Sequence, residues 1–178
     1  GLVAYLYDDH DFWTFENCDL QHGGSGIYTN SGAREHQGAA YLTVRNCTIR
    51  HIATPTFPNG SADGHAIGIQ GGHDFLIERN TFEDVGTGVT FYGWSWQEIH
   101  DNVVRWNFLR DVNHVGGGHG RAIETGGSLG AAYCGGNLWY GNILMDVTGT
   151  VDSSEGIGFR PTIPSLNGHD NTVLIFNN

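Results

Sequence analysis

The sequence predicts an all-β fold in which short strands stack as a solenoid. Three observations support this prediction: a nine-residue phrase that returns every 27 to 36 residues, a short apolar phrase between its copies, and glycine at 28 of 178 positions. Glycine is more than twice as frequent as the average of about 7%, so turns are abundant. Aromatic residues make up 12% of the chain and provide surface to bury, so residues 1–178 are expected to fold as a single domain.

The two phrases define the strands of each repeat. The nine-residue phrase reads FENCDLQHG in its first copy, and the copies begin at Phe15, Val44, Ile77, Val104, Trp139 and Ile175. The second phrase begins at Gly26, Ala66, Gly88, Ala122 and Gly156. Both alternate apolar and polar residues with period two, which is typical of strands. Each repeat therefore contains at least two strands joined by glycine-rich turns, and the chain forms five to six coils.

Charged residues in the aligned copies test this register. The second position of the phrase reads Glu16, Arg45, Glu78 and Arg105, and the seventh reads Gln21, Arg50, Glu83, Arg110 and Met145. Neighbouring strands of a parallel stack lie about 4.8 Å apart, a separation at which opposite charges stabilise and like charges destabilise. The alternation of sign therefore predicts that these residues stack coil upon coil.

The fourth position of the phrase predicts an asparagine ladder. It reads Cys18, Cys47, Asn80, Asn107, Asn142 and Asn178. Asparagine tolerates the left-handed backbone of a turn, and stacked side-chain amides can hydrogen-bond along the solenoid axis. Cys18 and Cys47 fall on successive coils, at a separation compatible with a disulfide. The alternative is that both are thiols that replace asparagine in the ladder.

With these phrases and this ladder, essentially the whole chain resembles the right-handed parallel β-helix family. The family includes pectate lyases, polygalacturonases, alginate lyases, mannuronan epimerases, phage tailspikes and surface adhesins. The resemblance implies an extracellular or cell-surface location and a polysaccharide partner, but it does not select one activity. Both ends of the sequence fall within the repeat, so we expect a piece of a longer helix or a unit that self-associates end to end.

Charge and hydropathy exclude two kinds of partner. Eight arginines, with no lysine, stand against 19 acidic residues, giving a formal net charge of -11. Such a chain repels a polyanion at long range, so we expect no nucleic-acid partner. No apolar run approaches the roughly 18 residues of a membrane helix, so we expect no membrane insertion.

Polar residues around the second phrase are the candidate site. If Ile67, Val89 and Ile123 point into the core, period two directs Glu124 outward. Gln70, Tyr92 and Arg160 follow on that face, and Asp63, His65, Arg121 and Glu155 lie at its edge. An acid, an imidazole and guanidinium groups can bind a uronate carboxylate and move the proton at its α-carbon. The catalytic candidates are Glu124, Arg121, His65, Asp63 and Arg160, and Gln70, Tyr92 and Glu155 are expected to bind substrate.

The spacing of Asp63 and His65 is similar to an Asp-x-His motif of mannuronan epimerases. Lyases of this fold often use lysine or arginine as the base, usually with calcium. Because lysine is absent, the resemblance leaves Arg121 or Arg160 for that role, with calcium as a candidate cofactor. Inverting hydrolysis by Glu124 and Glu155 is an alternative, and so is a purely structural pairing of Glu124 with one of the arginines.

Two further groups of residues, a pair of tryptophans and a column of histidines and aspartates, have predicted roles. Trp94 and Trp96 follow Tyr92 at alternate positions, so they form either a platform for sugar rings or the hydrophobic end of a coil. One column contains His22, His51, Asp84, Asp111 and Asp146, and it predicts hydrogen bonds at a turn and no metal site. The competing functional class is a non-catalytic filament, tailspike or adhesin.

Overall fold

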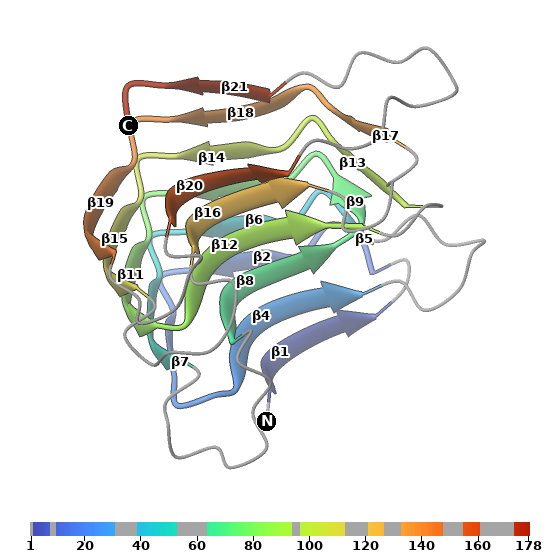
Figure 1. Ribbon diagram of the computed structural model, residues 1–178. Coiled ribbons are helices and arrows are strands. Elements are labelled where there is room, and N and C mark those ends of the chain that lie inside the picture. The colour runs from blue at the N-terminus through green and yellow to red at the C-terminus, as the bar shows by residue number, and fades with distance from the viewer. Residues whose placement is uncertain are drawn as a thin grey trace.

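The computed structural model describes residues 2–7, 10–30, 39–52, 64–93, 97–112, 121–126, 133–147, 155–160 and 173–178. These residues form strands and turns, and the strands pair in parallel within four sheets (Figure 1). No helix in these ranges is long and apolar enough to cross a membrane.

Each sheet collects one strand from successive coils. Sheet I contains β1 (Leu2–Tyr7), β4 (Ser25–Asn30), β8 (His65–Gln70), β12 (Thr87–Tyr92), β16 (Arg121–Gly126) and β20 (Glu155–Arg160). Sheet II contains β2 (Thr14–Glu16), β6 (Thr43–Arg45), β10 (Leu76–Glu78), β14 (Val103–Arg105), β18 (Asn137–Tyr140) and β21 (Val173–Phe176). Sheet III contains β3 (Asp19–Gln21), β7 (Thr48–Ile52), β11 (Thr81–Val85), β15 (Phe108–Val112) and β19 (Ile143–Val147). Sheet IV contains β5 (Ala39–Ala40), β9 (Gly72–His73), β13 (Glu98–His100) and β17 (Tyr133–Gly135).

The chain visits the sheets in the same order from coil to coil, although no sheet IV strand is described between β1 and β2 or between β20 and β21. After a strand of sheet I it passes through sheets IV, II and III, as β8, β9, β10 and β11 do, before it returns to sheet I with β12. Figure 1 shows the sheet I strands stacked in chain order from β1 to β20. The predicted all-β solenoid is confirmed. Four of the described coils have a further strand that neither phrase indicated, because the strands of sheet IV contain only two or three residues, too few to show a period.

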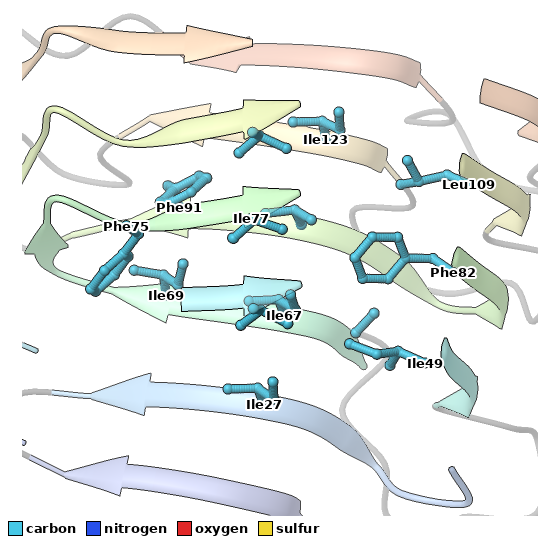
Figure 2. Close-up of a cluster of buried hydrophobic side chains, with 14 of the residues drawn as sticks. Ile27, Ile49, Ile67, Ile69, Phe75, Ile77, Phe82, Phe91, Leu109 and Ile123 are labelled. Carbon is cyan, nitrogen blue, oxygen red and sulfur yellow. The ribbon is translucent and has the colours of Figure 1, made fainter. Parts of the chain in front are cut away.

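Apolar side chains from sheets I, II and III fill the interior. Ile67 and Ile123 of sheet I, Ile77 of sheet II, and Phe82 and Leu109 of sheet III are all 0% exposed. Figure 2 shows these side chains pointing inward from the stacked strands, with aliphatic groups repeated from coil to coil. Complete burial of one such side chain stabilises the fold by about 1.5–3 kcal/mol. The repetition of this contribution on each coil accounts for the long, uninterrupted core.

The predicted register of the charged columns is confirmed. Glu16 pairs with Arg45 across β2 and β6, and their side chains form an ion pair of 3.0 Å. The second column is also in register, and Arg110 forms an ion pair with Glu83. One partner differs from the expected column: Arg50 bonds to Asp19, at 2.7 Å. Its counterpart on that neighbouring coil is the uncharged Gln21.

The asparagine ladder is present at the turn from sheet II to sheet III. The backbone N and the Nδ2 of Asn80 both donate to Oδ1 of Asn107, at 3.0 Å each. Asn107 donates in the same way to Asn142, at 3.1 and 2.9 Å, and Asn142 to Asn178, at 3.1 and 2.8 Å. A second ladder, which the pattern did not indicate, joins Asn102 to Asn137 by bonds of 3.1 and 2.9 Å.

The left-handed residue of this turn is not the ladder asparagine, which corrects the expectation. It is the preceding residue on each coil: Asn17, Asn46, Arg79, Trp106, Gly141 and Asn177, with φ between 51° and 64°. The ladder asparagine instead turns its amide inward, where it bonds to the neighbouring coils. Positive φ and the buried amide ladder are therefore separate requirements met by adjacent residues.

Cys18 and Cys47 are free thiols in the structure. Cys47 is buried, and its Sγ donates to the carbonyl oxygen of Arg45 at 3.2 Å, while its backbone N donates to Oδ1 of Asn80 at 2.9 Å. It thus occupies a ladder position without an amide. Burial raises the pKa of the Cys47 thiol above its ordinary value of 9.0.

Candidate functional site

The outward face of sheet I carries the candidate site. Gly68 lies between the buried Ile67 and Ile69 on β8, so its Cα faces away from the core. The register places Tyr28 and Thr90 beside Gly68, on β4 and β12. These positions form a column on the outer face of the sheet, three residues along the strand from His65.

A row of rings runs along this face parallel to the solenoid axis. The rings of Tyr5 and Tyr28 are 5.9 Å apart and inclined by 22°, and those of Tyr28 and His65 are 6.2 Å apart and inclined by 28°. Gly68 makes the row possible, since an added Cβ would lie 2.7 Å from Cδ2 of Tyr28 and 3.0 Å from Cδ2 of His65. The row therefore depends on glycine at this position.

His65 is buried on this outer face, with only 7% of its surface exposed. Its Nδ1 lies 3.2 Å from Oγ1 of Thr90, which is 3% exposed. Depending on the tautomer, the hydroxyl donates to Nδ1 or accepts from it. The Thr90 contact and the neighbouring Tyr28 ring fix the orientation of the imidazole, as is required of a group that moves a proton at a defined atom.

The backbone register brings four other predicted residues to the same sheet. Glu124 pairs with Thr90, Arg121 pairs with Glu155, and Arg160 pairs with Gly126. The first pairing places Glu124 one strand beyond the Thr90 that contacts His65. For these residues the structure describes the backbone positions, which agree with the predicted sharing of one sheet.

The remaining predicted residues divide into two groups. Gln70 pairs in register with Tyr92 and with Asn30, and it is 6% exposed. Asp63, Trp94 and Trp96 lie outside the described residues.

The sequence interpretation missed Tyr5 and Tyr28 as parts of this face. Tyr28 is the third residue of the first copy of the second phrase, in the same column as Gly68, Thr90 and Glu124. The same period-two argument that directs Glu124 outward would have identified Tyr28 on this face. Tyr5 lies before the first copy of either phrase and is placed only by the pairing of β1 with β4.

The histidine and aspartate column forms a hydrogen bond, as expected, but His51 and Asp84 lie inside strands β7 and β11, so the expected turn is a left-handed bend within sheet III. His22, His51 and Asp84 all have positive φ, the two imidazoles stack at 5.2 Å, and Nδ1 of His51 lies 2.7 Å from Oδ2 of Asp84. Within the described part of the chain, no three His, Cys, Asp or Glu side chains are grouped so as to hold a metal ion.

The comparison with known families agrees with this architecture. Residues 3–132 match the family described as right handed beta helix region. No curated protein and no solved structure matches the chain. Because the match covers well over half of the chain and the structure has the expected parallel coils, the chain belongs to the right-handed β-helix family.

Proposed function

We propose that this chain is an extracellular polysaccharide-binding β-helix whose sheet I face holds a uronic-acid-containing glycan and acts on it as a lyase or epimerase. The observation that carries the proposal is the buried His65, oriented by Thr90 beside a row of tyrosine rings. Arg121, Glu124 and Glu155 occupy neighbouring strands of the same sheet.

The parts of this face suit an acidic sugar. Pyranose rings pack against aromatic side chains, which the accessible part of the row, Tyr5 and Tyr28, offers. A guanidinium binds a carboxylate through two parallel hydrogen bonds, which is the proposed role of Arg121 and Arg160. Gln70 and Tyr92, in register on β8 and β12, are proposed to bind sugar hydroxyls.

The proposed chemistry begins at the carbon that bears the carboxylate. A base, His65 or one of the arginines, removes the proton from this carbon, and the arginines stabilise the negative charge that develops on the carboxylate. In elimination, the bond to the neighbouring glycosidic oxygen breaks, a carbon–carbon double bond forms, and the leaving oxygen takes a proton. In epimerisation, a proton returns to the opposite face of the same carbon. Glu124 is the proposed proton donor for either outcome.

Proton NMR of polysaccharide incubated with the protein distinguishes these reactions. Alginate, pectin and chondroitin are the substrates, each with calcium and with a chelator. New alkene protons indicate elimination, whereas an altered ratio of uronate signals without alkene protons indicates epimerisation. We expect turnover of at least one polymer, and turnover of none would contradict the catalytic part of the proposal.

Matched variants assign the reaction to sheet I. Arg121→Gln and Glu124→Gln should lower turnover at least about 100-fold without loss of folding. Arg110→Gln and Glu83→Gln make the same changes of charge in an ion pair on sheet III, and they should retain turnover. Equal turnover in all four variants would refute the assignment of the site.

A structural role is the second candidate, and exposed apolar side chains on the first coil favour it. Val3, Tyr5, Phe12 and Trp13 are 38%, 44%, 74% and 46% exposed. One more coil, from the same polypeptide or from a second copy, would cover them. Electron microscopy of the purified chain separates the candidates, since filaments without turnover support the structural role and discrete particles with turnover support the enzyme.

A further inference from the structure

The turn from sheet II to sheet III has an unusual pair of residues. On most coils its left-handed position is occupied by asparagine or glycine, which adopt positive φ readily. Arg79 and Trp106 occupy it on two successive coils, each with φ of 54°. Neither side chain favours this backbone conformation, so the two larger residues need another explanation.

Arg79 and Trp106 contact each other on the surface. The Cζ atom of Arg79 lies 5.1 Å from the centre of the Trp106 ring, and the indole is 44% exposed. Gly141, at the same position on the next coil, leaves room for the indole, because an added Cβ would lie 2.5 Å from Cδ1 of Trp106. The exposed guanidinium is thus positioned against an exposed ring.

Within the described ranges, Arg79 differs from Arg45 and Arg105 in having no acidic partner. Arg45 forms an ion pair with Glu16 at 3.0 Å. Arg105 also lies over Trp106, at 4.4 Å, but it binds Glu78 at 2.7 Å and the hydroxyl of Tyr140 at 2.8 Å. Among the side chains that the structure describes, no carboxylate lies within 4.0 Å of the Arg79 guanidinium. A cation without an acidic partner among the described side chains is notable in a chain with a formal net charge of -11.

We propose that Arg79 and Trp106 form a second binding site for an acidic sugar, separate from sheet I. The guanidinium would take the uronate carboxylate in a bidentate pair, and the exposed part of the indole would contact the sugar ring. The choice of a uronate rests on the proposed function. A second site on the same chain raises the effective concentration of a long polymer at sheet I, so it would favour binding of polymers over short fragments.

The test is the indole NMR signal of Trp106, assigned by its loss in Trp106→Phe. The probes are trimers of galacturonate, mannuronate and guluronate, with the methyl ester of trigalacturonate as a neutral control of equal size. At least one acidic trimer should shift the signal saturably, and the methyl ester should not. Arg79→Gln should weaken this response at least about tenfold, whereas Arg110→Gln, whose arginine is already paired, should not change it.

Three outcomes would overturn the inference: an unchanged response in Arg79→Gln, a response to the methyl ester equal to that of the acid, or a response to a sulfated galactan trimer but to no uronate. Calorimetry with the same trimers separates this site from sheet I. Uronate binding without any shift of Trp106 refutes the second site and leaves the proposed function standing. A shift of the Trp106 signal that persists in Arg121→Gln supports the second site. If the protein at the same time leaves every polymer chemically unchanged, the proposed catalysis is contradicted.

Discussion

Arg105, one coil after Glu78, donates two hydrogen bonds to the same carboxylate oxygen of Glu78. Its Nη2 lies 2.7 Å and its Nε 2.8 Å from that oxygen. The Glu78 side chain is only 7% exposed, whereas that of Arg105 is 28% exposed. The hydrogen bonds that Arg105 donates to the Tyr140 hydroxyl and to the Glu78 carboxylate raise the pKa of Arg105, which therefore keeps its charge at any ordinary pH. The pair is the most buried contact of the alternating column that the sequence predicted.

Glu78→Gln should lower the free energy of unfolding by about 1–3 kcal/mol, because it leaves Arg105 without its charged partner. Glu16→Gln is the matched control, since it removes the acid of the exposed pair with Arg45, whose side chains are 37% and 42% exposed. That loss should be much smaller, because water screens an exposed ion pair. Urea unfolding measures both, and equal losses would show that burial does not govern the strength of this column.

Cys47→Asn should stabilise the fold by about 0.5–1.5 kcal/mol, because it extends the asparagine ladder by one coil. The new amide could donate to Oδ1 of Asn80 and to the carbonyl oxygen of Phe15, which Sγ of Cys47 contacts at 3.5 Å. Thermal and urea unfolding test this. A loss of stability would mean that the position requires a smaller, apolar side chain.

The raised pKa of Cys47 predicts a dependence of stability on alkaline pH. Below the ordinary thiol pKa, the folded and unfolded states are both protonated and this group has no effect. Above it, the unfolded state loses the proton while the folded state keeps it, so the free energy of unfolding falls as pH rises until the folded pKa is reached. The fall above about pH 9 should be smaller in Cys47→Asn.

Thiol labelling with a disulfide reagent provides a second readout of the same environment. In the folded protein Cys47 should react more slowly than Cys18, which is less buried. Both should react fully in denaturant without a reductant. Failure of either to react in denaturant would reveal a disulfide between them.

Two glycines of sheet I should respond differently to alanine. In Gly88→Ala the new Cβ would lie 2.1 Å from the carbonyl oxygen of Ala122, which is backbone of the next coil, so we expect a loss of about 1–3 kcal/mol or more. In Gly68→Ala the nearest obstacles are ring atoms of the Tyr28 side chain, which is only partly buried and can turn outward. That variant should keep more stability and lose glycan binding. Urea unfolding and calorimetry decide the point, and intact binding by Gly68→Ala would remove the ring row from the site.

The repeat made the fold predictable because each coil imposes the same requirements on the same column. The apolar period, the alternating charge and the asparagine position all recur in each copy. A wrong alignment of one copy would therefore disagree with the others. The columns did not predict which of several nearby acidic residues a given arginine would bind. Arg50 lies between two coils and bonds to Asp19, a choice that depends on side-chain geometry and not on register.

The sequence predicted where the candidate site lies, but not which residues orient its side chains. Period two placed His65, Glu124 and Arg121 on one sheet, and the register agrees. The partner that orients His65 is Thr90, from the next coil, and its ring neighbour is Tyr28, from the preceding one. Such contacts between coils depend on which side chains occupy the space left by the missing side chain of Gly68. The local sequence pattern does not predict this.

The most direct test of the account is a crystal structure of the chain with a bound oligouronate. We predict sugar rings over Tyr5 and Tyr28, beside His65, with a carboxylate at the strand that carries Arg121. A sheet I face without sugar at a saturating concentration of each oligouronate would contradict the account.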